Sequence, residues 1–137
     1  VAAVVVLMII ATTIDAPLHE SRIAHRRAAN WLQSNADTQG AILDTRGWTK
    51  LYTGRTTYRY DEAPTALVDP ELAYVVVEQR DLDFDSPRAR TLREVLRRGG
   101  SRQAVIPGPD GQPSKCVLVY AWDAERFSRT VAEVLAN

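Results

Sequence analysis

Residues Ala73 to Glu78 read AYVVVE, and this stretch decides the fold class. Its three consecutive valines form a continuous β-branched run without polar alternation. Such a run is typical of a strand that is buried on both faces. The stretch therefore predicts a sheet that carries helices on both sides.

The segments before this strand alternate between helical and extended patterns. A helix beginning after Pro17 and ending near Asn35 is predicted by apolar residues at three- and four-residue spacing, namely Ile23, Ala24, Ala28, Trp31 and Leu32. Further elements are expected in this order: a strand at 41–45, helical turns at 46–53 that end at Gly54, a strand at 56–60, and a short helix at 61–69 that Pro70 stops.

The segments after the strand complete an α/β pattern. Ser86 and Pro87 are typical of a helix start, and Gly99-Gly100 is typical of its end. Strands at 103–106 and 115–122 flank a loop rich in Pro and Gly, which favours an antiparallel hairpin. Asp123 is expected to cap a last helix whose apolar side holds Phe127, Val131, Val134 and Leu135.

This order of elements predicts a small three-layer, Rossmann-like α/β domain over residues 17–137. The expected sheet is mixed and partly parallel, and the chain ends with a β-hairpin plus a helix. The length of 137 residues fits one domain.

The chain opens with the uncharged run VAAVVVLMIIATTI, residues Val1 to Ile14. As a helix this run would extend about 21 Å, whereas a membrane span needs about 20 apolar residues. We interpret residues 1–16 as an apolar stem, the end of a transmembrane helix. Two alternatives remain open, a buried core helix and a first core strand over residues 4–10. A signal peptide is disfavoured because a basic start and a small-residue cleavage site are not visible.

The composition excludes several function classes. Lys+Arg and Asp+Glu are both 17, so the chain lacks the excess positive charge that nucleic-acid binding requires. The glycine patterns of dinucleotide and P-loop sites are missing, and no cofactor is predicted. Asp81 and Asp83 would suit a small metal-dependent transferase. We favour an acidic loop before the next helix and predict no metal site there.

The densest group of polar and aromatic residues is Asp44 to Tyr60, DTRGWTKLYTGRTTYRY. Its first part follows a predicted strand, and open α/β sheets bind ligands at the carboxyl ends of their strands. The arginines could hold a phosphate and the aromatic rings could stack on a sugar. The substrate-binding candidates are Asp44, Arg46, Trp48, Tyr52 and Arg55. The alternative is that this stretch serves only for capping and packing.

Several of these segments occur together in one known family. They are RAANWL at 27–32, Asp44, Gly47-Trp48, LYTGR at 51–55, Asp69-Pro70 before AYVVVE, and the closing VLVYAW at 117–122. Together with the apolar stem they cover nearly the whole chain. The chain resembles the C-terminal soluble tail of bacterial polytopic membrane glycosyltransferases of the C superfamily, which includes protein mannosyltransferase-like and aminoarabinose transferase-like proteins.

The resemblance implies an accessory domain. In that family the donor is a polyprenyl-phosphate sugar, and the catalytic acidic residue lies in an early extracytoplasmic loop that this sequence does not contain. No catalytic residue is therefore assigned. The implied partners are the chain's own membrane domain and a polyprenyl-phosphate sugar or acceptor glycan. The implied location is membrane-anchored, with the domain on the periplasmic side. The competing hypothesis is a stand-alone α/β binding module in which residues 4–10 form a core strand.

Overall fold

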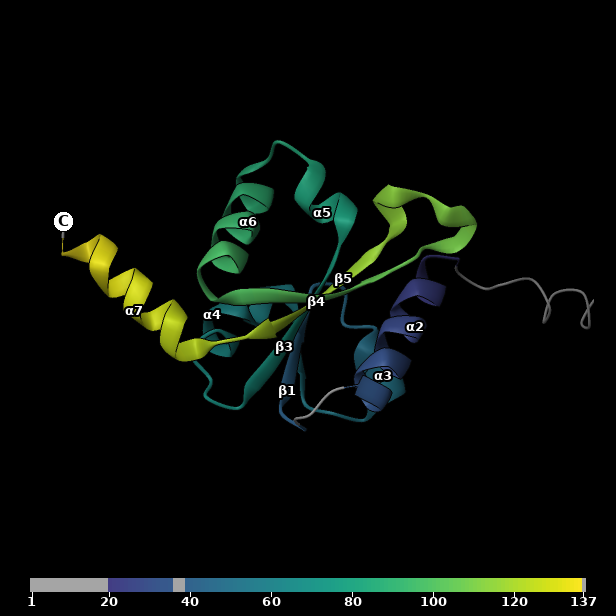
Figure 1. Cartoon of the computed structure of the whole chain (residues 1–137), viewed down its shortest axis with the longest axis horizontal. Helices are drawn as coiled ribbons and strands as arrows, with labels where there is room; N and C mark the ends of the chain where they lie inside the picture. The colour runs from purple at the N-terminus through teal and green to yellow at the C-terminus, as the bar shows by residue number, and fades with distance from the viewer. Residues whose placement is uncertain (1–19, 36–38, 137) are drawn as a thin grey trace, which may run out of the picture.

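Five strands form one mixed sheet in the order β2-β1-β3-β5-β4 in the computed structural model, which describes residues 20–35 and 39–136. In Figure 1, β1, β3, β4 and β5 cross the middle of the molecule between the helices. The strands are β1 (Ala41–Asp44), β2 (Thr57–Tyr58), β3 (Leu72–Glu78), β4 (Gly100–Ile106) and β5 (Val117–Trp122). β1 pairs in parallel with both β2 and β3. β5 is antiparallel to both β3 and β4. The mixed, partly parallel sheet and the C-terminal hairpin predicted from the sequence are thereby confirmed.

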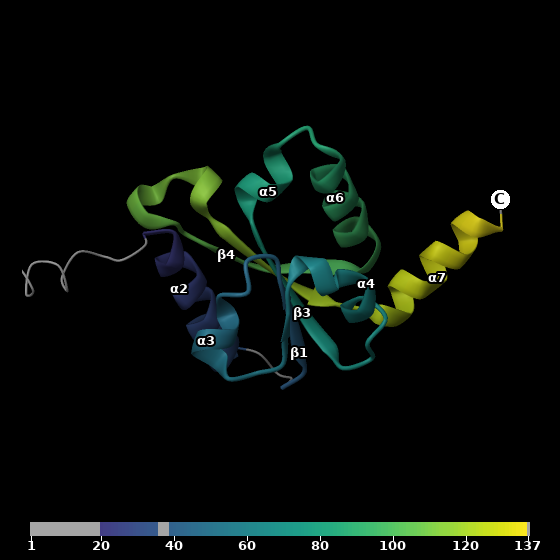
Figure 2. The ribbon, with the colours of Figure 1, turned by 180° about the vertical axis from the view of Figure 1, so that it is seen from behind.

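Helices cover both faces of this sheet. On one face lie α2 (Glu20–Asn35) and α3 (Thr49–Thr53), which contact each other. On the other lie α4 (Ala63–Ala66), α5 (Gln79–Asp83) and α6 (Pro87–Gly99), best seen from behind in Figure 2. The last helix, α7 (Ala124–Leu135), packs its first half against α6 and then projects from the body. Short 3-10 turns complete the chain at Tyr60–Glu62, Pro109–Gly111 and Pro113–Lys115.

The core consists of two apolar clusters, one on each face of the sheet. Ile42 and Val76 face α2, where they pack with Leu32. Val75 and Val77 face the opposite side, where α4 and α6 cover them. The three valines of β3 are at most 1% exposed, which confirms that this strand is buried on both faces. β3 therefore joins the two clusters into one domain.

The start and end residues of the helices act as the sequence predicts. The Ser86 side chain accepts a hydrogen bond from the Ala89 backbone N–H at 3.1 Å, and Pro87 follows at the first helical position. Asp123 does the same for α7 by accepting from the Arg126 N–H at 2.8 Å. Gly54 ends α3 at φ 64°, a left-handed conformation that glycine adopts without strain.

Two predicted boundaries are wrong. β4 begins at Gly100 rather than Gln103, directly after α6 and without a loop. A Cβ on Gly99 would lie 2.5 Å from the Trp122 ring, so only glycine lets α6 end this close to β5. Part of the expected acidic loop is helical, because Asp81 and Asp83 belong to α5.

The apolar side of α7 is less buried than its pattern indicates. Phe127 packs on Trp122 with the ring centroids 5.0 Å apart. Val134 and Leu135 are 57% and 83% exposed. Only the first half of this helix therefore contributes to the core.

The predicted apolar stem at 1–16, and the alternative core strand at 4–10, lie outside the described residues. Within residues 20–35 and 39–136, no helix has the length and apolar character of a membrane span. Both interpretations of the first residues therefore stay predictions.

The connections of β1 determine where side chains converge. The chain leaves β1 through α3 to reach β2, and it returns from β2 through α4 to β3. These two crossovers lie on opposite faces of the sheet. Ligands of open α/β sheets bind in the crevice that such diverging connections leave at the carboxyl ends of the strands.

Candidate functional site

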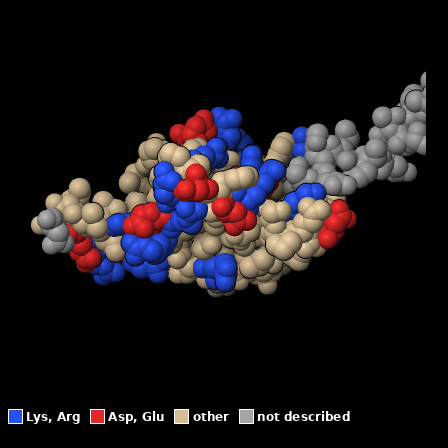
Figure 3. Space-filling view, turned by 90° about the horizontal axis from the view of Figure 1, so that it is seen from above, with Lys and Arg blue, Asp and Glu red and all other residues tan. Residues whose placement is uncertain are grey.

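A crevice of about 560 Å³ opens at the carboxyl ends of the three parallel strands. Arg46 and Trp48 follow β1, Arg59 and Tyr60 follow β2, Arg80 follows β3, and Arg88 comes from α6. Seen from above, the surface in Figure 3 shows Lys and Arg side chains interspersed with Asp and Glu side chains. The crevice is thus a basic site whose residues come from four segments of the chain.

A buried ionic cluster lies beneath this crevice. His25 of α2 is fully buried, and its Nε2 lies 3.0 Å from Glu78 Oε1 at the end of β3. Its Nδ1 lies 3.5 Å from Asp44 Oδ2 at the end of β1, as an ion pair without a well-aligned hydrogen bond. One imidazole therefore connects the carboxyl ends of two neighbouring strands to the helix that covers them.

The two carboxylates keep this imidazole charged. Burial by itself would lower the pKa of His25, but Asp44 and Glu78 outweigh it and raise that pKa to about 9. Burial would likewise raise the pKa of each carboxyl group, whereas the neighbouring imidazolium lowers both pKa values below their ordinary range. The cluster is therefore a cation held between two anions at neutral pH.

Asp44 also shapes the loop that follows β1. Its Oδ1 accepts a hydrogen bond from the Arg46 N–H at 2.9 Å, and its Oδ2 accepts one from the Thr49 N–H at 2.8 Å. These bonds fix the turn before α3 and direct Arg46 into the crevice. Asp44 is completely buried, so its role here is to position other residues.

Arginines cover the outer side of Glu78. Arg46 Nη2 lies 3.4 Å from Glu78 Oε2 and 2.7 Å from Asp81 Oδ1, while Arg80 also binds Glu78 Oε2. The side chains of Arg46 and Arg80 remain 34% and 44% exposed. Because a guanidinium group carries five N–H donors, both retain donors for a ligand in the crevice.

Each of the two aromatic rings that line the crevice lies against an arginine, and of these arginines Arg88 also lines the crevice. The guanidinium of Arg88 lies over the Tyr60 ring, 3.7 Å from its centroid. That of Arg22 lies over the Trp48 ring at 4.0 Å. Within the described part of the chain neither arginine makes an ion pair, so both add positive charge that no carboxylate neutralises. Such stacking holds the cations in place.

The structure separates the five predicted site residues. Arg46 and Trp48 line the crevice, and Asp44 lies beneath it. Tyr52 lies on α3, where its carbonyl accepts a bond from Gln33 at 3.0 Å. Arg55 precedes β2 and donates to the Gly40 carbonyl, at the amino ends of the parallel strands and thus at the opposite end from the crevice. The candidate site therefore contains the first three residues and excludes the last two.

Four residues of the site were not predicted from the sequence: His25, Glu78, Arg80 and Arg88. His25 lies three, four and seven residues before Ala28, Ala29 and Leu32, so helical spacing places it on the apolar, buried face of α2. Glu78 is the polar last residue of the most apolar strand, the place where such sheets present ligand-binding groups. These two patterns, read together, would have predicted the buried pair.

The two acidic residues of α5 are engaged within the chain, Asp81 in an ion pair and Asp83 in a hydrogen bond. Asp81 binds Arg46 and accepts a bond from the Thr45 hydroxyl at 3.3 Å. Asp83 accepts from Gln79 at 2.7 Å. Among residues 20–35 and 39–136, no group of three or more His, Cys, Asp or Glu side chains is placed to hold a metal ion.

Comparison with known proteins gives no match: no family model, no curated sequence and no solved structure matches this chain. The function is therefore inferred from the geometry of the crevice. It combines preorganised guanidinium groups with two aromatic rings, an arrangement that suits the binding of an anion.

Proposed function

We propose that the chain is an accessory domain of a membrane glycosyltransferase, and that its crevice binds the phosphate of a polyprenyl-phosphate sugar donor. The membrane role rests on the family resemblance described above. In this proposal the domain is anchored on the periplasmic side and packs against its own membrane domain. It binds substrate and carries no catalytic residue.

One observation carries the binding proposal: arginines from the ends of three parallel strands and from α6 converge on one crevice. Arg46 and Arg80 are fixed by Glu78, and Arg88 is fixed by Tyr60. Guanidinium groups that are already oriented bind phosphate at a lower entropic cost than mobile side chains do. The sequence predicts a Rossmann-like sheet. Sheets of that kind hold phosphates in the crevice at the carboxyl ends of neighbouring parallel strands, which here are β1 and β3.

The Trp48 ring supports the sugar part of the proposal, and Tyr60 is the second aromatic side chain of the crevice. Both rings are half-buried and line the same crevice as the arginines. One face of each ring is covered by an arginine. The apolar face of a sugar stacks on aromatic rings without needing a hydrogen-bond partner. The same surfaces would also serve an acceptor glycan.

The first prediction concerns phosphate binding. The full chain should bind mannose 1-phosphate, which carries the head group of such a donor without its lipid. Arg46→Ala and Arg88→Ala should each weaken that binding by about ten- to a hundredfold, because a charge-assisted contact contributes about 1.5–3 kcal/mol. Calorimetric titration measures the affinity.

Arg90→Ala is the matched control for Arg88→Ala. Arg90 lies two residues further along α6, is exposed, and pairs with Asp85 outside the crevice. It should leave the affinity unchanged. Equal affinity in all three variants, or no binding by a chain that is folded by circular dichroism, would contradict the proposal. Binding of the soluble phosphate but not of a lipid-linked one would favour the stand-alone binding module instead.

A further inference from the structure

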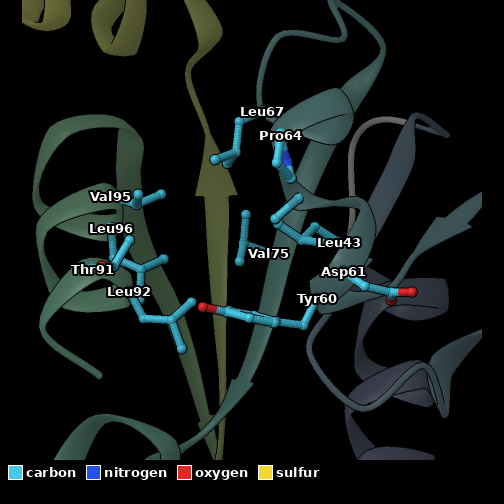
Figure 4. Close-up of a pocket in the computed structure, with 11 residues that line it drawn as sticks. Leu43, Tyr60, Asp61, Pro64, Leu67, Val75, Thr91, Leu92, Val95 and Leu96 are labelled. Atoms are coloured by element: carbon cyan, nitrogen blue, oxygen red, sulfur yellow. The ribbon is translucent and has the colours of Figure 1, made fainter. Parts of the chain in front are cut away.

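An apolar pocket of about 330 Å³ lies on the face of the sheet covered by α4 and α6 (Figure 4). Leu43 and Val75 of the sheet form its base. Leu67, from the segment after α4, faces Leu92 and Val95 of α6 across it. Almost all of its surface is apolar, so a ligand there would be held by burial of hydrocarbon.

This pocket meets the basic crevice at Tyr60. The Tyr60 side chain lines both, and Figure 4 shows its ring lying across one end of the pocket with the hydroxyl directed toward Leu92. Arg88 lies over the same ring at 3.7 Å. Asp61 also lines both, but it points away from the apolar side chains. One aromatic ring thus separates a group of cations from a hydrocarbon-lined space.

We propose that this pocket takes the hydrocarbon chain of an amphipathic phosphate ester whose phosphate lies in the crevice. The inference rests on the proposed phosphate site and adds the place where the hydrocarbon part of its ligand binds. A purely polar phosphate would leave the pocket without a function, and a purely apolar ligand would not use the arginines.

The pocket is large enough to hold a hydrocarbon chain and is larger than an ordinary packing defect. Protein interiors are close-packed and contain few voids larger than a water molecule. A cavity of about 150 Å³ holds one benzene molecule, so 330 Å³ has room for roughly ten carbon atoms. This is a short chain, or the first part of a longer one that continues outside.

The test compares two phosphate monoesters on the full chain. Geranyl phosphate, with ten carbon atoms, should bind at least about tenfold more tightly than methyl phosphate, because burial of only two or three methylene groups accounts for that ratio. Decyl phosphate has an unbranched chain of equal length. If it binds as tightly as geranyl phosphate, the pocket takes hydrocarbon chains generally; if it binds more weakly, the pocket selects branched, isoprenoid chains.

A variant that fills the pocket tests whether the tighter binding of geranyl phosphate comes from this site. Val95→Phe places a ring in the pocket and should remove the advantage of geranyl phosphate while leaving methyl phosphate binding unchanged. Val68→Phe is the matched control, since Val68 is 68% exposed and lies outside the pocket lining. An advantage that persists in Val95→Phe, or equal affinity for the two esters in the unmodified chain, would overturn the inference and leave the phosphate site standing. No binding of either ester would overturn both.

Discussion

Replacing His25 with glutamine is expected to lower the free energy of unfolding by about 3–5 kcal/mol, the usual cost of removing one partner from a buried ionic pair. His25 is fully buried between Glu78 at 3.0 Å and Asp44 at 3.5 Å. Its loss leaves two carboxylates without their buried cation, and the arginines of the crevice reach only the outer oxygen of Glu78. Urea unfolding at neutral pH measures the change.

Two further variants make this expectation specific. Arg26→Gln, at the neighbouring exposed position of α2, should change the stability by no more than about 0.5 kcal/mol. Glu78→Gln added to His25→Gln should recover part of the loss, because one of the two unpaired charges is then removed. A change below about 1 kcal/mol in His25→Gln alone would show that the imidazole carries no charge in the folded chain.

The second large effect is a dependence of stability on pH. The folded pKa of His25 is about 9, above the ordinary value of 6.5, so the folded chain binds a proton that the unfolded chain releases between these values. The stabilisation is fully present below about pH 6.5 and is lost as the pH rises through about 9. The size of the shift corresponds to a loss on the order of 3 kcal/mol.

The difference in unfolding free energy between the unmodified chain and His25→Gln reports on the coupled cluster of His25, Asp44 and Glu78, because titrating groups away from this cluster cancel in it. The difference should be largest near about pH 6 and should shrink toward about pH 10. Asp44 and Glu78 have lowered pKa values, so their contribution is present above their ordinary range and disappears as the pH falls through the folded values. A difference that is constant from pH 6 to pH 10 would contradict the charged-imidazole account.

The sequence predicts the elements whose cause is local. The valine run of β3, the Ser86-Pro87 start of α6 and the Gly54 end of α3 each depend on residues adjacent in the chain. The start of β4 could not be predicted in this way. It depends on Trp122 packing against Gly99, a contact between residues distant in the sequence.

The candidate site could be predicted only in part for the same reason. Arg46 was found because it follows a strand, which is a local pattern. Arg55 looked equivalent, but it precedes β2 and so lies at the amino ends of the parallel strands, away from the crevice. His25 and Arg88 reach the site from two helices on opposite faces of the sheet. Only the pairing of the strands brings such residues together.

Phosphate binding by the carboxyl-end crevice can be followed by NMR of the arginine Nε–Hε groups in the full chain during a titration with mannose 1-phosphate. The signals of Arg46, Arg80 and Arg88 should shift together along one binding curve. Those of Arg55 and Arg126, which donate to backbone carbonyls elsewhere, should not move. Equal shifts at all five arginines, or shifts confined to the latter two, would contradict the claim.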